Sequence, residues 1–179
     1  MSNQSGYKYD RVAKTLHWLI GVMVILLLFG GNFMESLPEA EKPAIAMVHS
    51  GIGSLILLLM IVRLIWRVGH PPPALLPAPA WQHAATRVVH WGFYGLVILQ
   101  PIFGILQARH TSFEVAPFGL FSLTGEPDES TFELFHELHE IGASLIIVFV
   151  LIHVGAAFYH HLFKKDAVLK RMTWGRVEP

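Results

Sequence analysis

Four long apolar segments alternate with polar or proline-rich connections along the chain. They cover about residues 16–33, 44–66, 88–107 and 138–163, and each approaches the roughly 20 residues that a helix needs to cross a bilayer. The first has a basic flank like that of a secretory signal, but it is long, and the following GGNFMESLPEAEKP has no small-x-small cleavage site. The pattern predicts an all-α integral membrane protein, a four-helix transmembrane bundle that forms one domain over residues 1–179.

The connections differ in character. The second, GHPPPALLPAPAW, is rich in proline and is expected to be extended along the membrane surface. The third, from about His110 to Glu133, contains FEVAPFGLFSL. That stretch is apolar enough to cover an opening of the bundle or to lie in the membrane interface.

Composition and charge support the membrane prediction and add an orientation. Of the 179 residues, 53% are hydrophobic and 15% are charged, which argues against a water-soluble domain. All but two of the 13 Lys and Arg residues lie in the N-terminus, the second connection or the tail, and the exceptions are Lys42 and Arg109. Because basic residues concentrate in cytoplasmic segments, we expect both termini in the cytoplasm. The acidic stretches from Glu35 to Glu41 and from Glu114 to Glu140 are then on the outer face.

Histidine is the only abundant metal ligand that the spans offer. The chain has no cysteine, which excludes disulfides, cysteine-ligated iron–sulfur clusters and covalently attached haem. Polar side chains within a membrane span usually face the bundle interior. The histidines within or beside the predicted spans are His17, His49, His90, His136, His139, His153, His160 and His161.

Spacing and helix direction group these histidines by depth. His139 and His153 are 14 residues apart, so at 100° per residue they share one helix face, and a rise of 1.5 Å per residue separates them by about 21 Å. They therefore belong to two sites. The direction of each helix pairs His17 with His153 toward the cytoplasm and His49 with His139 toward the outside. His136 lies about 100° away from His153 and is expected on the surface.

Two histidine pairs between helices are typical of the axial ligands of two b-type haems. Filling both axial positions favours electron transfer over oxygen activation. A single histidine in a span is more often an interhelical hydrogen-bonding group, but four that agree in face and depth favour ligation. A zinc site is disfavoured by the lack of cysteine or a nearby buried carboxylate. Geometry alone leaves His160 and His161 as competitors of His153.

The motifs around these residues resemble those of the bacterial cytochrome b561 family. They are LHW at His17, EKPAIAMVHSGIG at His49, VVHWGFYGLVILQPIFG in the third span, LHEIGA at His139 and IHVGAAFYHHLFKKD closing the fourth span. The resemblance implies haem ligation by His17, His49, His139 and His153, and it favours His153 over the two later histidines. It covers nearly the whole chain.

The resemblance also implies a function. The family transfers electrons in membranes, and its small standalone branch passes an electron from superoxide at the outer face to ubiquinone. The expected cofactors are two haem b with ubiquinone as acceptor, and the expected location is the bacterial inner membrane, as a multi-pass protein surrounded by lipid. The alternative is a di-haem subunit that links quinone to a partner dehydrogenase or a soluble cytochrome. A metal or proton transporter is disfavoured because the middle of every span lacks Asp and Glu. No nucleic acid is expected as a partner.

Candidate substrate residues lie at both membrane surfaces. Lys42 and Arg109, the only Lys and Arg residues expected on the outer face, are candidates to guide superoxide or to neutralise a haem propionate. The alternative is that both are simply solvated cations at the membrane interface. The candidates for quinone lie where the third span begins and the fourth ends: Arg87, His90, Trp91, His160 and His161. Interfacial anchoring and contact with a haem propionate explain Arg87 and Trp91 at least as well. Arg63 and Arg67 are interpreted as positive-inside anchors or partners of an inner propionate.

Overall fold

The computed structural model describes residues 8–38 and 40–174. Its four long helices are α1 (Arg11–Glu35), α2 (Lys42–Gly69), α3 (Ala80–Arg109) and α4 (Glu129–Tyr159). All four are long and apolar enough to cross a membrane, and no strand occurs in the described residues. The predicted all-α, four-helix architecture is confirmed. Glu39 and Arg176, which contribute to the predicted charge asymmetry, lie outside the described residues, as does the side chain of Glu35.

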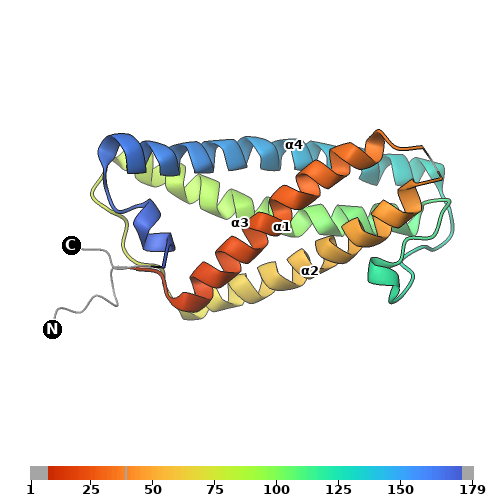
Figure 1. Cartoon of the computed structure of the whole chain (residues 1–179), viewed down its shortest axis with the longest axis horizontal. Helices are drawn as coiled ribbons and strands as arrows, with labels where there is room; N and C mark the ends of the chain where they lie inside the picture. Colours follow the sequence, from red (N-terminus) through yellow and green to blue (C-terminus); the bar gives the residue numbers. More distant parts are fainter. Residues whose placement is uncertain (1–7, 39, 175–179) are drawn as a thin grey trace.

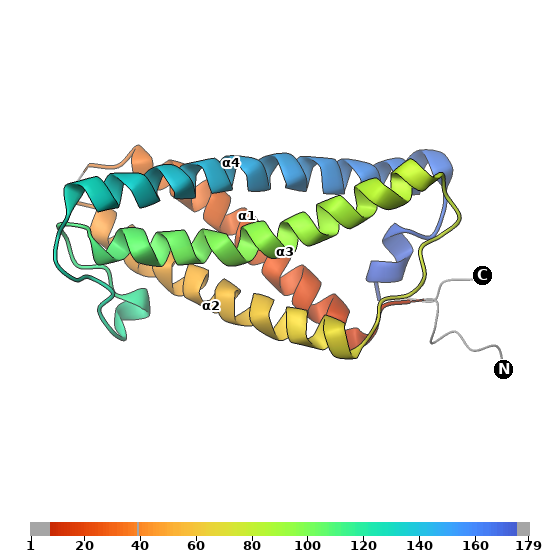
Figure 2. The same ribbon diagram turned by 180° about the vertical axis from the view of Figure 1, so that it is seen from behind.

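The helices run along the long axis of the molecule, with α1 crossing obliquely over the others (Figures 1 and 2). The helix pairs that pack most extensively are α1 with α2, α2 with α3, and α3 with α4. The start of α1, the connection between α2 and α3, and the segment after α4 lie at one end of the bundle. A short 3-10 helix, η2 (Pro117–Gly119), lies at the opposite end beside α2.

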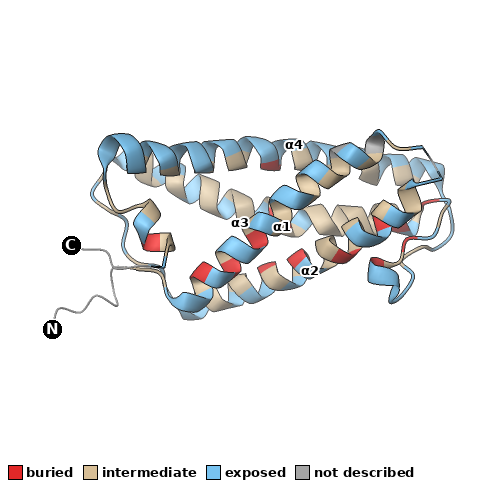
Figure 3. Cartoon of the chain, viewed as in Figure 1, coloured by how far each residue is buried: buried red, intermediate tan, exposed pale blue. Residues whose placement is uncertain are grey.

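Few residues of the bundle are buried (Figure 3), and many of the exposed side chains are large and apolar. The core joins Leu16 and Ile20 of α1, Ile56 and Met60 of α2, Tyr94 and Val97 of α3, and Ile146 of α4. Large apolar side chains such as Phe29 (74% exposed) and Val68 (75% exposed) point outward. Apolar exposure on this scale marks a membrane-contacting surface, which agrees with the helix lengths.

The first three helices extend beyond their predicted apolar segments at both ends, whereas α4 begins earlier than predicted, at Glu129, but ends at Tyr159, four residues before the predicted end. Capping side chains, which hydropathy does not register, mark the starts of α1 and α4. Asp10 is the N-cap of α1, where its carboxylate accepts from the Ala13 N–H at 2.9 Å. It also accepts from the Trp66 indole N–H at 3.2 Å, which ties the start of α1 to the end of α2. Asp128 caps α4 in the same way, on the Thr131 N–H.

After α4 the chain returns to α1. A π-helical turn, η3 (His160–Lys164), ends at Lys165, whose φ of 53° is left-handed. The 3-10 helix η4 (Leu169–Met172) follows, and the Trp18 indole of α1 donates to the Met172 carbonyl at 2.8 Å. The sequence offered no prediction of this return segment, which closes the end of the bundle between the last helix and the first.

The connection between α3 and α4 packs against α2. Phe118 has a left-handed φ of 50°, and its ring lies over Gly51, where a Cβ would overlap it. Leu120 and Phe121 beyond it are exposed. The connection therefore covers part of the first half of α2 and presents an apolar tip.

Candidate functional site

Toward the end that carries η2, His49 of α2 faces His139 of α4. Their ring centroids lie 6.2 Å apart. The His139 Nδ1–H donates to the Gln100 carbonyl of α3 at 3.0 Å, and the side-chain amide of Gln100 donates to the His139 carbonyl at 2.8 Å. The buried Nδ1 of His49 has no hydrogen-bond partner among the described residues. The His139 ring is thus held by α3, while the Nδ1 of His49 makes no hydrogen bond within the described part of the chain.

Toward the opposite end, His153 of α4 has two imidazole neighbours. The centroid of His17 in α1 lies 5.9 Å away, and that of His90 in α3 lies 6.0 Å away. Distance alone does not choose between them. The space between α3 and α4 at this level is filled, because the rings of Phe93 and Phe149 meet edge to face at 5.7 Å. By contrast, α1 and α4 are not among the extensively packed helix pairs of the described chain.

Both pairs fit a cofactor metal held between two imidazoles. A metal–nitrogen bond of about 2 Å, with the ring centroid about 1 Å behind the nitrogen, places two axial imidazole centroids about 6 Å apart. The observed 5.9 and 6.2 Å agree with that value. No group of three or more His, Asp or Glu side chains in the described residues is placed to hold one metal ion together, so the donor sets are pairs. That suits a haem, whose porphyrin supplies the other four ligands.

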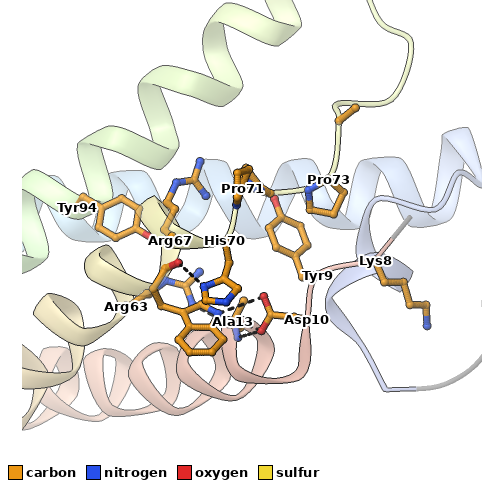
Figure 4. A pocket seen from close by; sticks show the side chains of 14 residues that line it. Lys8, Tyr9, Asp10, Ala13, Arg63, Arg67, His70, Pro71, Pro73 and Tyr94 are labelled. Carbon is orange, nitrogen blue, oxygen red and sulfur yellow. Dashed lines mark hydrogen bonds between the residues drawn. The ribbon is translucent and has the colours of Figure 1, made fainter. Parts of the chain in front are cut away.

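A cavity of about 520 Å³ lies between the start of α1 and the end of α2, and basic and aromatic side chains are part of its lining (Figure 4). Its wall includes Arg63, whose guanidinium donates to the Ala13 carbonyl at 2.8 Å, and Arg67, which stacks over Trp91 and Tyr94 at 5.7 Å from each ring centroid. These arginines are therefore ordered by protein contacts. They place positive charge on the wall of this cavity.

The quinone candidates fall into two groups. Arg87, His90 and Trp91 line one cavity of about 330 Å³ together with Tyr9 and Arg67. His160 and His161 line neither cavity.

His160 instead donates from Nδ1 to the Asp166 carboxylate at 2.5 Å. Partial burial acts to raise the pKa of Asp166, but hydrogen bonds from His160 and the Val168 N–H outweigh it and hold that pKa below its ordinary value. Nothing in the sequence pattern singled out Asp166, because one carboxylate in a polar tail carries no periodic signal.

At the end of the bundle that carries η2, Lys42 is the first residue of α2 and Arg109 the last of α3. Lys42 is half-buried and Arg109 is exposed. The backbone carbonyl of Arg109 accepts from the Gly125 N–H at 2.8 Å, so the connection between α3 and α4 folds against it. The Nε2 of His136 in α4 lies 3.4 Å from Glu140 Oε1.

A helical membrane bundle with facing imidazole pairs at two depths defines the class of protein. A family model for prokaryotic cytochrome b561 matches residues 8–175, and the chain belongs to that family. It is therefore a membrane electron-transfer protein of oxidoreductase type, and b-type haem is the family's cofactor.

Curated relatives match over nearly their whole length. A probable superoxide oxidase CybB of Yersinia pestis is 30% identical over 171 residues, which covers 92% of this chain and 95% of that protein. Cytochrome b561 homolog 1 of Escherichia coli (strain K12) is 27% identical, with coverage of 91% and 97%. A probable Ni/Fe-hydrogenase B-type cytochrome subunit of Rhizobium leguminosarum bv. viciae is 22% identical, with coverage of 98% and 90%.

Proposed function

We propose that residues 1–179 form one di-haem domain that acts as a superoxide:ubiquinone oxidoreductase in the bacterial inner membrane, with both termini in the cytoplasm. Two superoxide anions would lose one electron each and leave as oxygen, and one ubiquinone would take up those two electrons and two protons. The observation that carries the proposal is the pair of facing imidazoles at each of two depths. The similarity to the probable superoxide oxidase supports the choice of donor.

The four paired histidines would hold the cofactors. His49 and His139 would bind the outer haem and His17 and His153 the inner one. Haem held by these pairs would supply one-electron chemistry, and two histidine ligands per haem would favour electron transfer over oxygen activation. His17 is preferred to His90 because Phe93 and Phe149 fill the gap between α3 and α4.

The substrates would meet the chain at opposite faces. Lys42 and Arg109 would attract the superoxide anion to an otherwise acidic outer surface. Arg87, His90 and Trp91 would line the quinone site in the smaller cavity. His160, held by Asp166, lies at the same end of the chain's fold and would pass protons from cytoplasmic water.

A second candidate is a di-haem subunit that links quinone to a partner dehydrogenase or soluble cytochrome. The similarity to a hydrogenase cytochrome subunit favours it. Both candidates use the same haems, and they differ in the donor.

The experiment that separates them supplies the purified protein with superoxide and a soluble ubiquinone. We expect the reduced b-haem band to appear and quinol to accumulate, and added superoxide dismutase to abolish both. A His49→Ala variant is expected to lose the response. Reduction of the haems by dithionite but not by superoxide would contradict the proposal and favour the partner-subunit function.

A further inference from the structure

The side of α3 that faces His139 has no side chain at Gly104. Pro101 also lies inside this helix, where its missing N–H removes the helical hydrogen bond to the carbonyl of Val97, four residues earlier. A helical side chain leans toward the N-terminus and covers the carbonyl four residues earlier, and Gly104 has none to cover the carbonyl of Gln100. The His139 ring fills the space, because a Cβ on Gly104 would lie 3.1 Å from its Cε1.

Two hydrogen bonds join residues 100 and 139 in both directions. The His139 Nδ1 bonds to the Gln100 carbonyl at 3.0 Å, and the Gln100 Nε2 bonds to the His139 carbonyl at 2.8 Å. Gly142 in α4 makes room for the amide, since a Cβ there would overlap Gln100 Oε1. Gly104 of α3 and Gly142 of α4 therefore leave the space in which Gln100 and His139 make these two hydrogen bonds.

The contact determines which nitrogen of His139 carries the proton. A carbonyl oxygen only accepts, so Nδ1 is the protonated nitrogen and Nε2 keeps its lone pair. An acceptor on the Nδ1–H also fixes the ring orientation and raises the basicity of the imidazole as a ligand. His49 has no such acceptor in the described residues, so only one imidazole of the outer pair is tuned in this way.

We propose that Gln100 and Gly104 form a positioning site that fixes the tautomer and orientation of His139 and makes the outer haem harder to reduce. A more basic axial ligand favours the oxidised metal, so the site disfavours retention of an electron on the outer haem. This inference rests on the proposed ligand role of His139.

The test is a redox titration of the purified holoprotein, followed by reduced-minus-oxidised spectra and by the g values of the low-spin ferric haem. In Gly104→Ala the new Cβ displaces the His139 ring from the carbonyl. We expect the ratio of reduced to oxidised outer haem at a fixed potential to rise by up to about tenfold, because the net value of one hydrogen bond limits how differently that bond can act on the two oxidation states. Gly95→Ala on the same helix, where a Cβ meets nothing within 4 Å, is the matched control and is expected to titrate like the unchanged protein.

A second variant adds no volume. Gln100→Met removes the amide that anchors the contact, and we expect a smaller shift in the same direction. It carries the test if Gly104→Ala loses haem. Unchanged potentials and g values in the variant that retains both haems would overturn the proposal.

A His139→Ala variant separates this failure from that of the proposed function. If His139→Ala keeps both haems, the ligand assignment itself is wrong, and the positioning site falls with it. If His139→Ala loses one haem while the positioning variants titrate normally, only the positioning role is wrong.

Discussion

His153 has two imidazole neighbours at almost equal distance, and only one of them can oppose it across an iron. The ring centroids of His17 and His90 lie 5.9 and 6.0 Å from it. On the His90 side the rings of Phe93 and Phe149 fill the gap between the helices. We therefore expect His17→Ala to remove the inner haem and His90→Ala to retain it.

The size of the effect follows from the separation of the two sites. His17→Ala is expected to lower the haem content from two to one per polypeptide. The outer pair lies about 21 Å away along α4, well beyond the 7–10 Å over which substitutions usually couple. The outer haem should therefore keep its spectrum and potential.

The assay is the ratio of haem to protein after purification, combined with reduced-minus-oxidised spectra. Gel filtration in detergent checks that each variant remains folded and monodisperse. The reasoning is refuted if His90→Ala loses one haem while His17→Ala keeps two. In that case α3 supplies the ligand, and the packing between Phe93 and Phe149 must open to admit the macrocycle.

Three further predictions concern the ends of the bundle. Asp10→Ala removes the N-cap of α1 and should lower the free energy of unfolding by about 0.5–2 kcal/mol, measured by thermal unfolding in detergent. Gly51→Ala adds a Cβ that overlaps the Phe118 ring, so the connection between α3 and α4 should be cleaved faster in limited proteolysis. The overlap should lower the free energy of unfolding by about 1–3 kcal/mol. Asp166→Asn replaces the charged acceptor of His160 by a neutral one and should slow quinone reduction about threefold to tenfold, a loss of about 1 kcal/mol, without changing haem reduction by superoxide.

Each of these predictions can be checked by a pH dependence, a control variant or a comparison of two rates. Burial acts to raise the pKa of Asp10, but hydrogen bonds from Ala13 and Trp66 outweigh it and hold that pKa below the ordinary 3.8. The contribution of Asp10 to stability is therefore complete above pH 3.8 and is lost as the pH falls through its lower pKa in the folded state. A loss of stability in Asp10→Ala that stays constant at all pH values would contradict this.

Gly53→Ala is the control for Gly51→Ala. It places a Cβ in ordinary contact with Leu27 at 3.9 Å and should not change proteolysis. Equal slowing of haem and quinone reduction in Asp166→Asn would place its effect outside the quinone step.

The fold could be predicted from the sequence because lipid imposes a simple rule. An apolar run of helical length has few alternatives to crossing the bilayer, and all four segments became helices. The helix ends were less predictable. α4 begins at Glu129, nine residues before the apolar segment, because Asp128 caps a polar helix start that hydropathy does not register.

The candidate site was partly predictable for a similar reason. Residue spacing gives the face and depth of a histidine on a helix, and the structure places His17 near His153 and His49 near His139. Their role as haem ligands stays a prediction. Gln100 was not foreseen because its contact with His139 depends on how α3 packs on α4, and spacing along one helix contains no information about that packing. The short distance between His90 and His153 was not predicted for the same reason, because it also depends on how α3 packs on α4.

Both imidazole pairs draw one member from α4, the last long helix to be synthesised. His17 and His49 enter the membrane before α4, and neither pair is complete until α4 lies beside them. Under the proposed ligand assignment, both haems would therefore be bound only at the last step of assembly. A chain cut before α4 would offer each proposed site one of its two paired imidazoles, and we expect such a product to lack the haem spectrum of the full chain.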